Sequence, residues 1–206
     1  MLGEAVEDEL IGMNPATRRG RTKTLALAAT QGDREQLSRF VAAARENERR
    51  HFPMFFTMAR TGMRLGEAFG LQWQDVNLVD REIRIARGVS GGRVETPKSR
   101  KARTVDMSVA LRDVLQHHDA ASKAKALESG KERPEWVFPS MEGTFLDRAN
   151  VEKAFKRALK DGGLPLHFSP HCLRHTYASL LLQDGVSPAY VQEQLGHSSI
   201  KLTVDT

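Results

Sequence analysis

Near its C-terminus the chain carries the stretch His167-Phe-Ser-Pro-His-Cys-Leu-Arg-His-Thr-Tyr-Ala-Ser179. Its Ser169-Pro170 pair combines a favoured N-cap residue with a favoured first helical residue, so a helix is expected to begin there. In such a helix His171, Arg174 and His175 occupy positions i, i+3 and i+4 and project from one face. A guanidinium and two imidazoles on one helical face favour an anion-binding site.

The composition is that of a globular protein with a modest excess of positive charge. The 206 residues include 31 Lys and Arg against 26 Asp and Glu, a formal net charge of +5. This balance favours a polyanionic partner such as nucleic acid, although charge alone does not single it out. The length suffices for one large domain, or a domain and a remnant of another, with a buried core.

Cysteine usage and hydropathy favour a cytoplasmic protein. Cys172 is the only cysteine, which excludes an internal disulfide framework and suits a reducing compartment. We expect its thiol to pack as a small apolar group rather than act as a nucleophile. No apolar run approaches the roughly 18 residues that span a bilayer, and the acidic residues 1–9 lack the pattern of a signal peptide.

Residue periodicity predicts a mainly α fold with a small three-stranded antiparallel β-sheet. Helices are expected from an Asp33 cap to Ala44, over 52–61, briefly at 64–71, and over 108–126, 147–161, 169–184 and 187–195. Extended pieces at 82–87, 93–96 and 103–106 predict the sheet, with a basic hairpin tip at 97–101. The phenylalanines of the 52–61 helix fall on one apolar stripe, which indicates core packing rather than base stacking.

Arginine and histidine side chains are suited to phosphodiester cleavage. The reaction needs positive charge at two non-bridging oxygens, a proton acceptor for the nucleophile and a proton donor for the leaving oxygen. Arg64 and Arg174 can each present a planar fork to phosphate oxygens, a geometry that lysine cannot match. Two such forks can take the place of the metal ions used by other phosphoryl-transfer sites.

Four motifs together resemble the catalytic signature of the tyrosine recombinases, the phage integrase family. In chain order they are Thr61-Gly-Met-Arg64-Leu-Gly-Glu67, Lys98 in the basic hairpin, His171-Cys-Leu-Arg174-His175, and Leu195-Gly-His197-Ser-Ser199. The resemblance covers roughly residues 22–206. Each motif alone is weak, but their order and spacing make a specific combination.

The resemblance implies a role for each principal residue of these motifs. Arg64 and Arg174 would hold the scissile phosphate, and His197 would donate a hydrogen bond to it. His171 would handle the proton of the nucleophile. Lys98 would be the general acid that protonates the departing 5′ oxygen, and no cofactor or metal is implied.

Supporting roles are expected for the neighbours of these residues. Glu67 would brace the first arginine or a nearby histidine, whereas Arg100 and Lys101 would contact the DNA backbone. His175 is expected to be mainly structural beside the site. A zinc site at the two histidines has suitable i, i+4 spacing. It is disfavoured because the usual intervening glutamate is absent and Arg174 would repel a divalent cation.

The nucleophile that the resemblance requires is absent from the 206 residues. Relatives carry a tyrosine about ten residues after the last histidine motif, which corresponds to position 207, just after Thr206. Tyr177 occupies the place of a core aromatic, and Tyr190 lies on the preceding helix. We therefore expect the chain to be a fragment that does not cleave DNA as written.

The resemblance also implies a domain organisation and partners. Residues 1–15 would be a remnant of the last helix of a core-binding domain, 16–24 a basic linker, and 25–206 a catalytic domain lacking its C-terminal end. The expected partner is double-stranded DNA. Relatives act as homotetramers on two duplexes, whereas this fragment is expected to be monomeric and to have no membrane contact.

Two other functions remain open at this point. A non-catalytic DNA-binding module could retain the phosphate pocket without the chemistry, and a tyrosine just past Thr206 would argue against it. A type IB topoisomerase or a telomere resolvase would share the same chemistry. The Leu195-Gly-His-Ser-Ser199 motif and the compact size argue against this second alternative.

Overall fold

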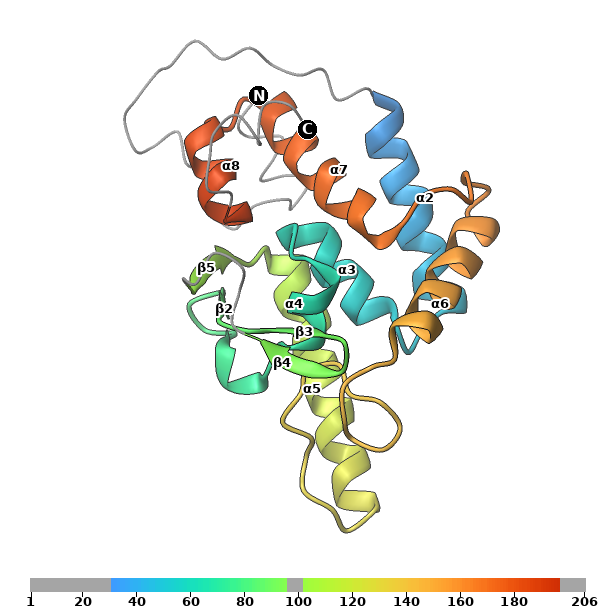
Figure 1. Ribbon diagram of the computed structural model, residues 1–206, viewed down its shortest axis with the longest axis vertical. Helices are drawn as coiled ribbons and strands as arrows, with labels where there is room; N and C mark the ends of the chain where they lie inside the picture. Colours follow the sequence, from blue (N-terminus) through green and yellow to red (C-terminus); the bar gives the residue numbers. More distant parts are fainter. Residues whose placement is uncertain (1–30, 96–101, 197–206) are drawn as a thin grey trace.

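The computed structural model describes residues 31–95 and 102–196, so the expectations for residues 1–15, 16–24, 97–101 and 198 onward lie outside the described residues. Helices dominate the fold, with two small antiparallel sheets among them (Figure 1). The elements are α2 (Gln31–Asn47), α3 (Phe52–Thr61), α4 (Leu65–Phe69), the 3-10 turn η2 (Trp73–Asp75), β1 (Val76–Asn77), β2 (Glu82–Ile85), β3 (Gly88–Ser90), β4 (Arg93–Glu95), β5 (Arg103–Asp106), α5 (Val109–Glu128), α6 (Arg148–Asp161), α7 (Pro170–Gln183) and α8 (Pro188–Leu195). The predicted fold class is confirmed. No helix among the described residues is long and apolar enough to cross a membrane.

Three helices begin where the sequence places an N-cap residue. Side-chain oxygens of Ser108, Asp147 and Ser187 accept hydrogen bonds from backbone N–H groups three residues further on, at the starts of α5, α6 and α8. The start of α2 differs, because this helix begins at Gln31 and not after Asp33. Asp33 instead lies in the first turn, where a carboxylate interacts favourably with the helix dipole.

The three-stranded sheet has the order β1-β2-β5, and β3 and β4 form a separate two-stranded hairpin. The prediction that residues 93–96 belong to the larger sheet is therefore wrong. Burial explains the difference: Ile83, Ile85 and Val105 alternate towards the core, whereas all three residues of β4 are exposed. Gly91 and Gly92, both with positive φ, make the turn that pairs β4 with β3.

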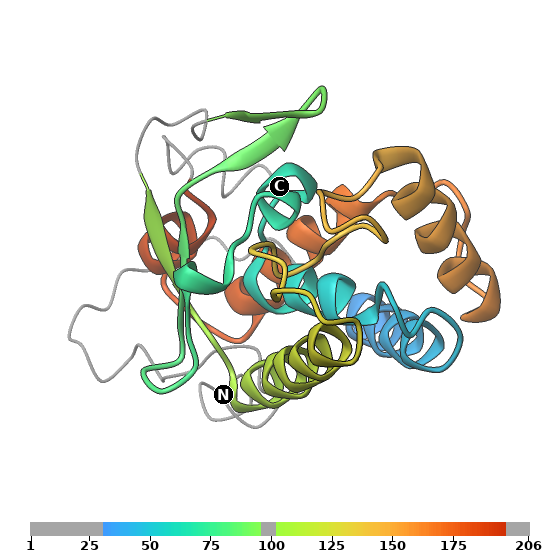
Figure 2. The same ribbon diagram turned by 90° about the horizontal axis from the view of Figure 1, so that it is seen from below.

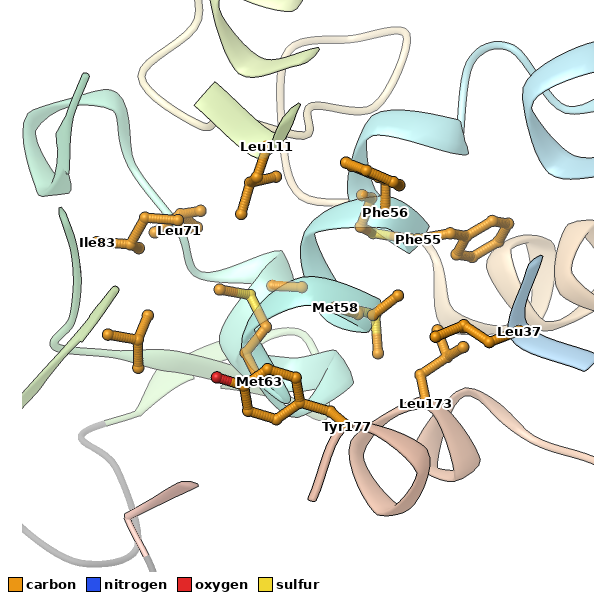
Figure 3. Packing of buried hydrophobic residues seen from close by; sticks show 14 of the residues in the cluster. Leu37, Phe55, Phe56, Met58, Met63, Leu71, Ile83, Leu111, Leu173 and Tyr177 are labelled. Atoms are coloured by element: carbon orange, nitrogen blue, oxygen red, sulfur yellow. The ribbon is translucent and has the colours of Figure 1, made fainter. Parts of the chain in front are cut away.

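Helix α3 lies at the centre of the core (Figure 3). Around it pack residues of α2, α5, α7 and the β-sheet, among them Leu37, Ile83, Leu111, Leu173 and Tyr177. The ring of Phe55 lies 5.7 Å from that of Phe40 and 5.5 Å from that of Phe155, which joins α2, α3 and α6. Phe55 and Phe56 are buried, so the predicted core role of this aromatic stripe is confirmed for both.

Glycine lets α4 lie directly against the backbone of β3. A Cβ atom at Gly66 would lie 2.8 Å from the carbonyl oxygen of Val89, and one at Gly70 would lie 3.0 Å from the Cα of Gly88. Such distances exclude any larger residue unless the strand moves. The contact keeps the β3–β4 hairpin, green in Figure 2, beside the N-terminus of α4.

The Gly66→Ala variant should test this contact. Alanine favours a helix over glycine by about 1 kcal/mol, yet its methyl group must displace the backbone of Val89, at a cost of about 1–3 kcal/mol. We therefore expect a net loss in the free energy of unfolding, measured by urea denaturation at pH 7. A variant as stable as the parent, or more stable, would show that α4 does not depend on this approach.

Candidate phosphate-binding site

Arg64 lies at the N-terminus of α4, directly after a sharp turn. Helix α3 ends at Gly62, whose φ of 64° is left-handed, and Arg64 then becomes the N-cap residue of α4. A Cβ atom at Gly62 would approach the ring of Tyr177 to 2.6 Å, so the turn also needs a glycine for space. The Arg64 side chain is 41% exposed, which leaves its guanidinium accessible to a ligand.

Glu67 binds two arginines with its one carboxylate. Its Oε1 accepts hydrogen bonds from Nη1 of Arg64 and Nη1 of Arg103, both at 2.9 Å. Its Oε2 accepts from the backbone N–H of Arg64 and from Nη2 of Arg103, both at 2.8 Å. Burial opposes ionisation, but the hydrogen bonds and charges of Arg103 and Arg64 outweigh it and lower the pKa of Glu67 to about 2. The carboxylate is thus ionised at neutral pH and holds both the backbone N–H and the guanidinium of Arg64.

Arg174 is buried and connects three helices. Its side chain leaves α7 and donates from Nη1 to the carbonyl oxygen of Gly62 at 2.8 Å and from Nη2 to that of Leu195 at 2.7 Å. Burial and the nearby charge of Arg64 lower its pKa to about 9, so the guanidinium remains charged at neutral pH. These two bonds fix the plane of the guanidinium against the ends of α3 and α8.

The two histidines of α7 lie at the surface, whereas Arg174 is buried. The three side chains therefore do not share one face, although the sequence predicts that they do. His171 and His175 are exposed and their rings meet edge-on with centroids 4.6 Å apart, whereas Arg174 is only 3% exposed. Partial desolvation of the ring, His175, Arg174 and Arg64 lower the pKa of His171, and partial desolvation and Arg174 lower that of His175. The lowered pKa of each ring favours its neutral form, which can accept a proton.

Arg64, Glu67 and His171 line one cavity of about 350 Å³. Residues of α4, β3, β4, α6 and the start of α7 complete its wall: Leu65, Gly66, Gly88, Val89, Ser90, Glu95, Arg148, Glu152, Ser169 and Pro170. Arg64 is close enough to lower the pKa of both His171 and Arg174. The cavity thus combines the accessible guanidinium of Arg64, which can bind an anion, with the imidazole of His171, which can accept a proton.

The structure places His175 outside this cavity. His175 lines a second, smaller hollow with Phe40, Phe155 and Cys172, and Cys172 is partly exposed there rather than fully buried. Lys98, Arg100, Lys101 and His197 lie outside the described residues. Strands β4 and β5 flank the segment that contains the first three, and Gly196, which ends α8, directly precedes the fourth.

Arg103 was not identified as a site residue from the sequence, although a signal for it exists. It is paired with Ile85 across β2 and β5, and directly opposed residues of an antiparallel pair share one face of the sheet. Val105, two residues on, is buried on that same face. An arginine that alternates with a core valine must point inward, where a buried cation needs a carboxylate partner.

Comparison with known sequences gives consistent matches. A sequence model of the phage integrase family matches residues 32–205. Tyrosine recombinase XerC of Neisseria meningitidis serogroup B is 34% identical over 155 residues, which cover 75% of this chain and 46% of the relative. A tyrosine recombinase XerC-like protein of Caldanaerobacter subterraneus subsp. tengcongensis is 30% identical over 171 residues, which cover 74% of this chain and 44% of the relative. The chain thus spans about half the length of these relatives.

Solved structures with the same fold include complexes with DNA. The Tn1549 transposon integrase in complex with transposon right end DNA has a TM-score of 0.71 at 20% identity, over 98% of this chain and 69% of that one. XerA recombinase has a TM-score of 0.68 at 24% identity, over 89% of this chain and 60% of that one. A lambda integrase dimer bound to a core site has a TM-score of 0.61 at 22% identity, over 98% and 67% of the two chains.

Proposed function

Because the chain belongs to the phage integrase family, we propose that it is the catalytic part of a site-specific recombinase that cleaves and rejoins double-stranded DNA. The observation that carries this proposal is the meeting of Arg64 from α4 with His171 from α7 at one cavity, with Arg174 close enough for the charge of Arg64 to lower its pKa. These residues come from distant parts of the chain and are those that the family motifs select.

The proposed reaction is a transesterification at a DNA phosphate. The hydroxyl oxygen of a tyrosine, expected at position 207, attacks phosphorus while the bond from phosphorus to the 5′ oxygen breaks, which leaves a 3′-phosphotyrosyl linkage. His171 accepts the tyrosine proton, and Lys98 gives a proton to the 5′ oxygen. The reverse attack by a 5′ hydroxyl of a partner strand restores the phosphodiester and the tyrosine.

Two arginines are proposed to stabilise the negative charge that develops on the phosphate in the transition state. We assign Arg64 and Arg174 to the non-bridging oxygens of the phosphate, together with a hydrogen bond from His197. Glu67 keeps the Arg64 guanidinium in place through the bond to Nη1. A guanidinium that is already oriented needs no rearrangement when charge develops on the phosphate, which is the basis of its effect on rate.

The proposal extends to partners and compartment. We propose that the full-length protein acts as a homotetramer on two duplexes in the cytoplasm, and that residues 1–206 alone are monomeric. Solved relatives in complex with DNA support a duplex as substrate. We assign residues 1–15 to the last helix of a preceding core-binding domain, 16–24 to a basic linker and 25–206 to the catalytic domain without its C-terminal end.

A covalent trapping experiment tests the proposal without knowledge of the target sequence. The reading frame is continued through position 207, and the protein is mixed with nicked duplexes of randomised sequence, from which the short cleaved fragment that carries the new 5′ hydroxyl diffuses away. We expect a protein–DNA adduct that survives SDS, is linked at a 3′ phosphate and forms equally well in EDTA. The matched control carries phenylalanine at position 207.

The outcomes separate the alternatives. Retention of duplex DNA with no adduct would contradict the proposal and favour a binding module without chemistry. Adducts combined with relaxation of a supercoiled plasmid, but with no exchange between two sites, would instead favour a type IB topoisomerase. Sequencing the trapped duplexes would identify the target site of a recombinase.

A further inference from the structure

Arg103 is an almost buried cation at the first position of β5. Its side chain is 9% exposed and makes three hydrogen bonds at short range. Two of them run in parallel to Oε1 and Oε2 of Glu67 at 2.9 and 2.8 Å, and the third runs from Nε to the carbonyl oxygen of Gln194 at 2.9 Å. Such a fork to a carboxylate fixes both partners in one plane.

These bonds connect β5 with α4 and with the end of α8. Through Glu67, Arg103 reaches the backbone N–H and the Nη1 of Arg64 at the start of α4. Through Gln194, it holds the last turn of α8, which the chain leaves towards His197. Arg103 itself begins the strand that follows the segment with Lys98.

The end of α8 is shaped to receive the arginine. Gly196 has a φ of 65°, and a Cβ atom there would lie 2.8 Å from Cδ of Arg103. The aliphatic part of the Arg103 side chain thus packs against Gly196. Glycine is the one residue type that adopts this positive φ without strain and has no side chain to block the contact. The contact fixes where the chain leaves α8 relative to β5.

We propose that Arg103 is a positioning residue of the recombination reaction, which aligns Arg64 through Glu67 and holds the end of α8 beside it. The inference rests on the proposed function for its effect on rate, but the alignment itself is a property of the folded chain. Lysine cannot replace this arginine, because one ammonium cannot bridge two carboxylate oxygens and a carbonyl oxygen in this geometry. The expected signature is slow chemistry with unchanged DNA affinity.

The experiment compares Arg103→Lys with Arg87→Lys. Arg87 also forms an ion pair with a buried carboxylate, that of Asp75, but it lines no part of the cavity. Both variants are made in the chain continued through position 207. Three quantities are measured for each: the thermal midpoint, the dissociation constant for a nicked duplex, and the single-turnover cleavage rate at saturating protein. In parallel, the Nε–Hε signal of Arg64 is followed by 15N NMR and assigned by its loss in Arg64→Ala.

We expect Arg103→Lys to cleave about 10–100-fold more slowly, with a dissociation constant within about threefold of the parent. Arg87→Lys should lose a comparable amount of thermal stability and keep its cleavage rate within about threefold. The Arg64 signal should shift in Arg103→Lys only. Equal cleavage rates for the two variants, or an Arg64 signal unmoved by Arg103→Lys, would overturn the proposal. If the parent forms no adduct, the proposed function fails, and the NMR comparison still decides whether Arg103 aligns Arg64.

Discussion

Lysine in place of Arg174 is expected to slow DNA cleavage by about 10³-fold while changing duplex affinity by less than about threefold. Arg174 holds its guanidinium plane with one bond to the carbonyl oxygen of Gly62 and one to that of Leu195. A lysine ammonium is a point charge without the planar fork of a guanidinium. It therefore cannot contact both carbonyl oxygens and also direct a donor at a phosphate. On the proposed function, most of the binding energy for duplex DNA is expected from backbone contacts over a wider surface, which this substitution leaves intact.

The same substitution should also reduce stability, and this effect must be separated from catalysis. A buried carbonyl oxygen left without a donor costs about 1–3 kcal/mol, so the unfolding midpoint in urea will fall. Cleavage is therefore measured under conditions in which circular dichroism shows the variant to be fully folded. A rate that equals that of the parent would contradict the phosphate assignment of Arg174, as would a loss that merely follows the unfolded fraction.

Local signals in the sequence suffice for the starts of three helices and for part of the site. Ser108, Asp147 and Ser187 each cap the helix that follows, because the cap depends only on neighbouring backbone groups. His171 and Arg174 were recognised from their spacing within the motifs, and the fold brings His171 to the same cavity as Arg64. Patterns that span a few residues can therefore be interpreted from the sequence alone.

Contacts between distant segments could not be predicted in the same way. The partners of Arg103 lie 36 and 91 positions away in the sequence, and no local pattern indicates which carboxylate an inward arginine will meet. The inward path of Arg174 has the same origin, since it depends on where α3 and α8 end. Strand β4 was assigned to the wrong sheet because three exposed residues carry no information about which edge they pair with.

Glutamine in place of Glu67 is expected to lower the free energy of unfolding by about 3 kcal/mol at pH 7, and by progressively less at lower pH. Hydrogen bonds and charges from Arg103 and Arg64 overcome the cost of burial and lower the pKa of Glu67 from 4.5 to about 2. Above pH 4.5 the carboxyl is ionised in both the folded and the unfolded chain, so its full stabilisation is present. Between pH 4.5 and 2 only the unfolded chain takes up the proton, and stability falls; below pH 2 the contribution is gone.

The measurement is a series of urea unfolding curves for the parent and Glu67→Gln from pH 7 to pH 3. Glu152→Gln provides the matched control, because Glu152 pairs with Arg148 on the surface, where the two side chains are 43% and 75% exposed. An exposed pair of this kind contributes about 0–1 kcal/mol. The difference between parent and Glu67→Gln should shrink steadily as the pH falls below about 4.5, whereas the Glu152→Gln difference should stay small throughout.

The pH dependence distinguishes an ionic bridge from simple packing. A glutamine has nearly the same shape as glutamate, so lost packing contacts would give a difference that is constant with pH. Loss of the carboxylate leaves the guanidiniums of Arg64 and Arg103 close together without the charge that lies between them. A constant difference would therefore refute the ionic role of Glu67, and with it the alignment of Arg64 through a charged bridge.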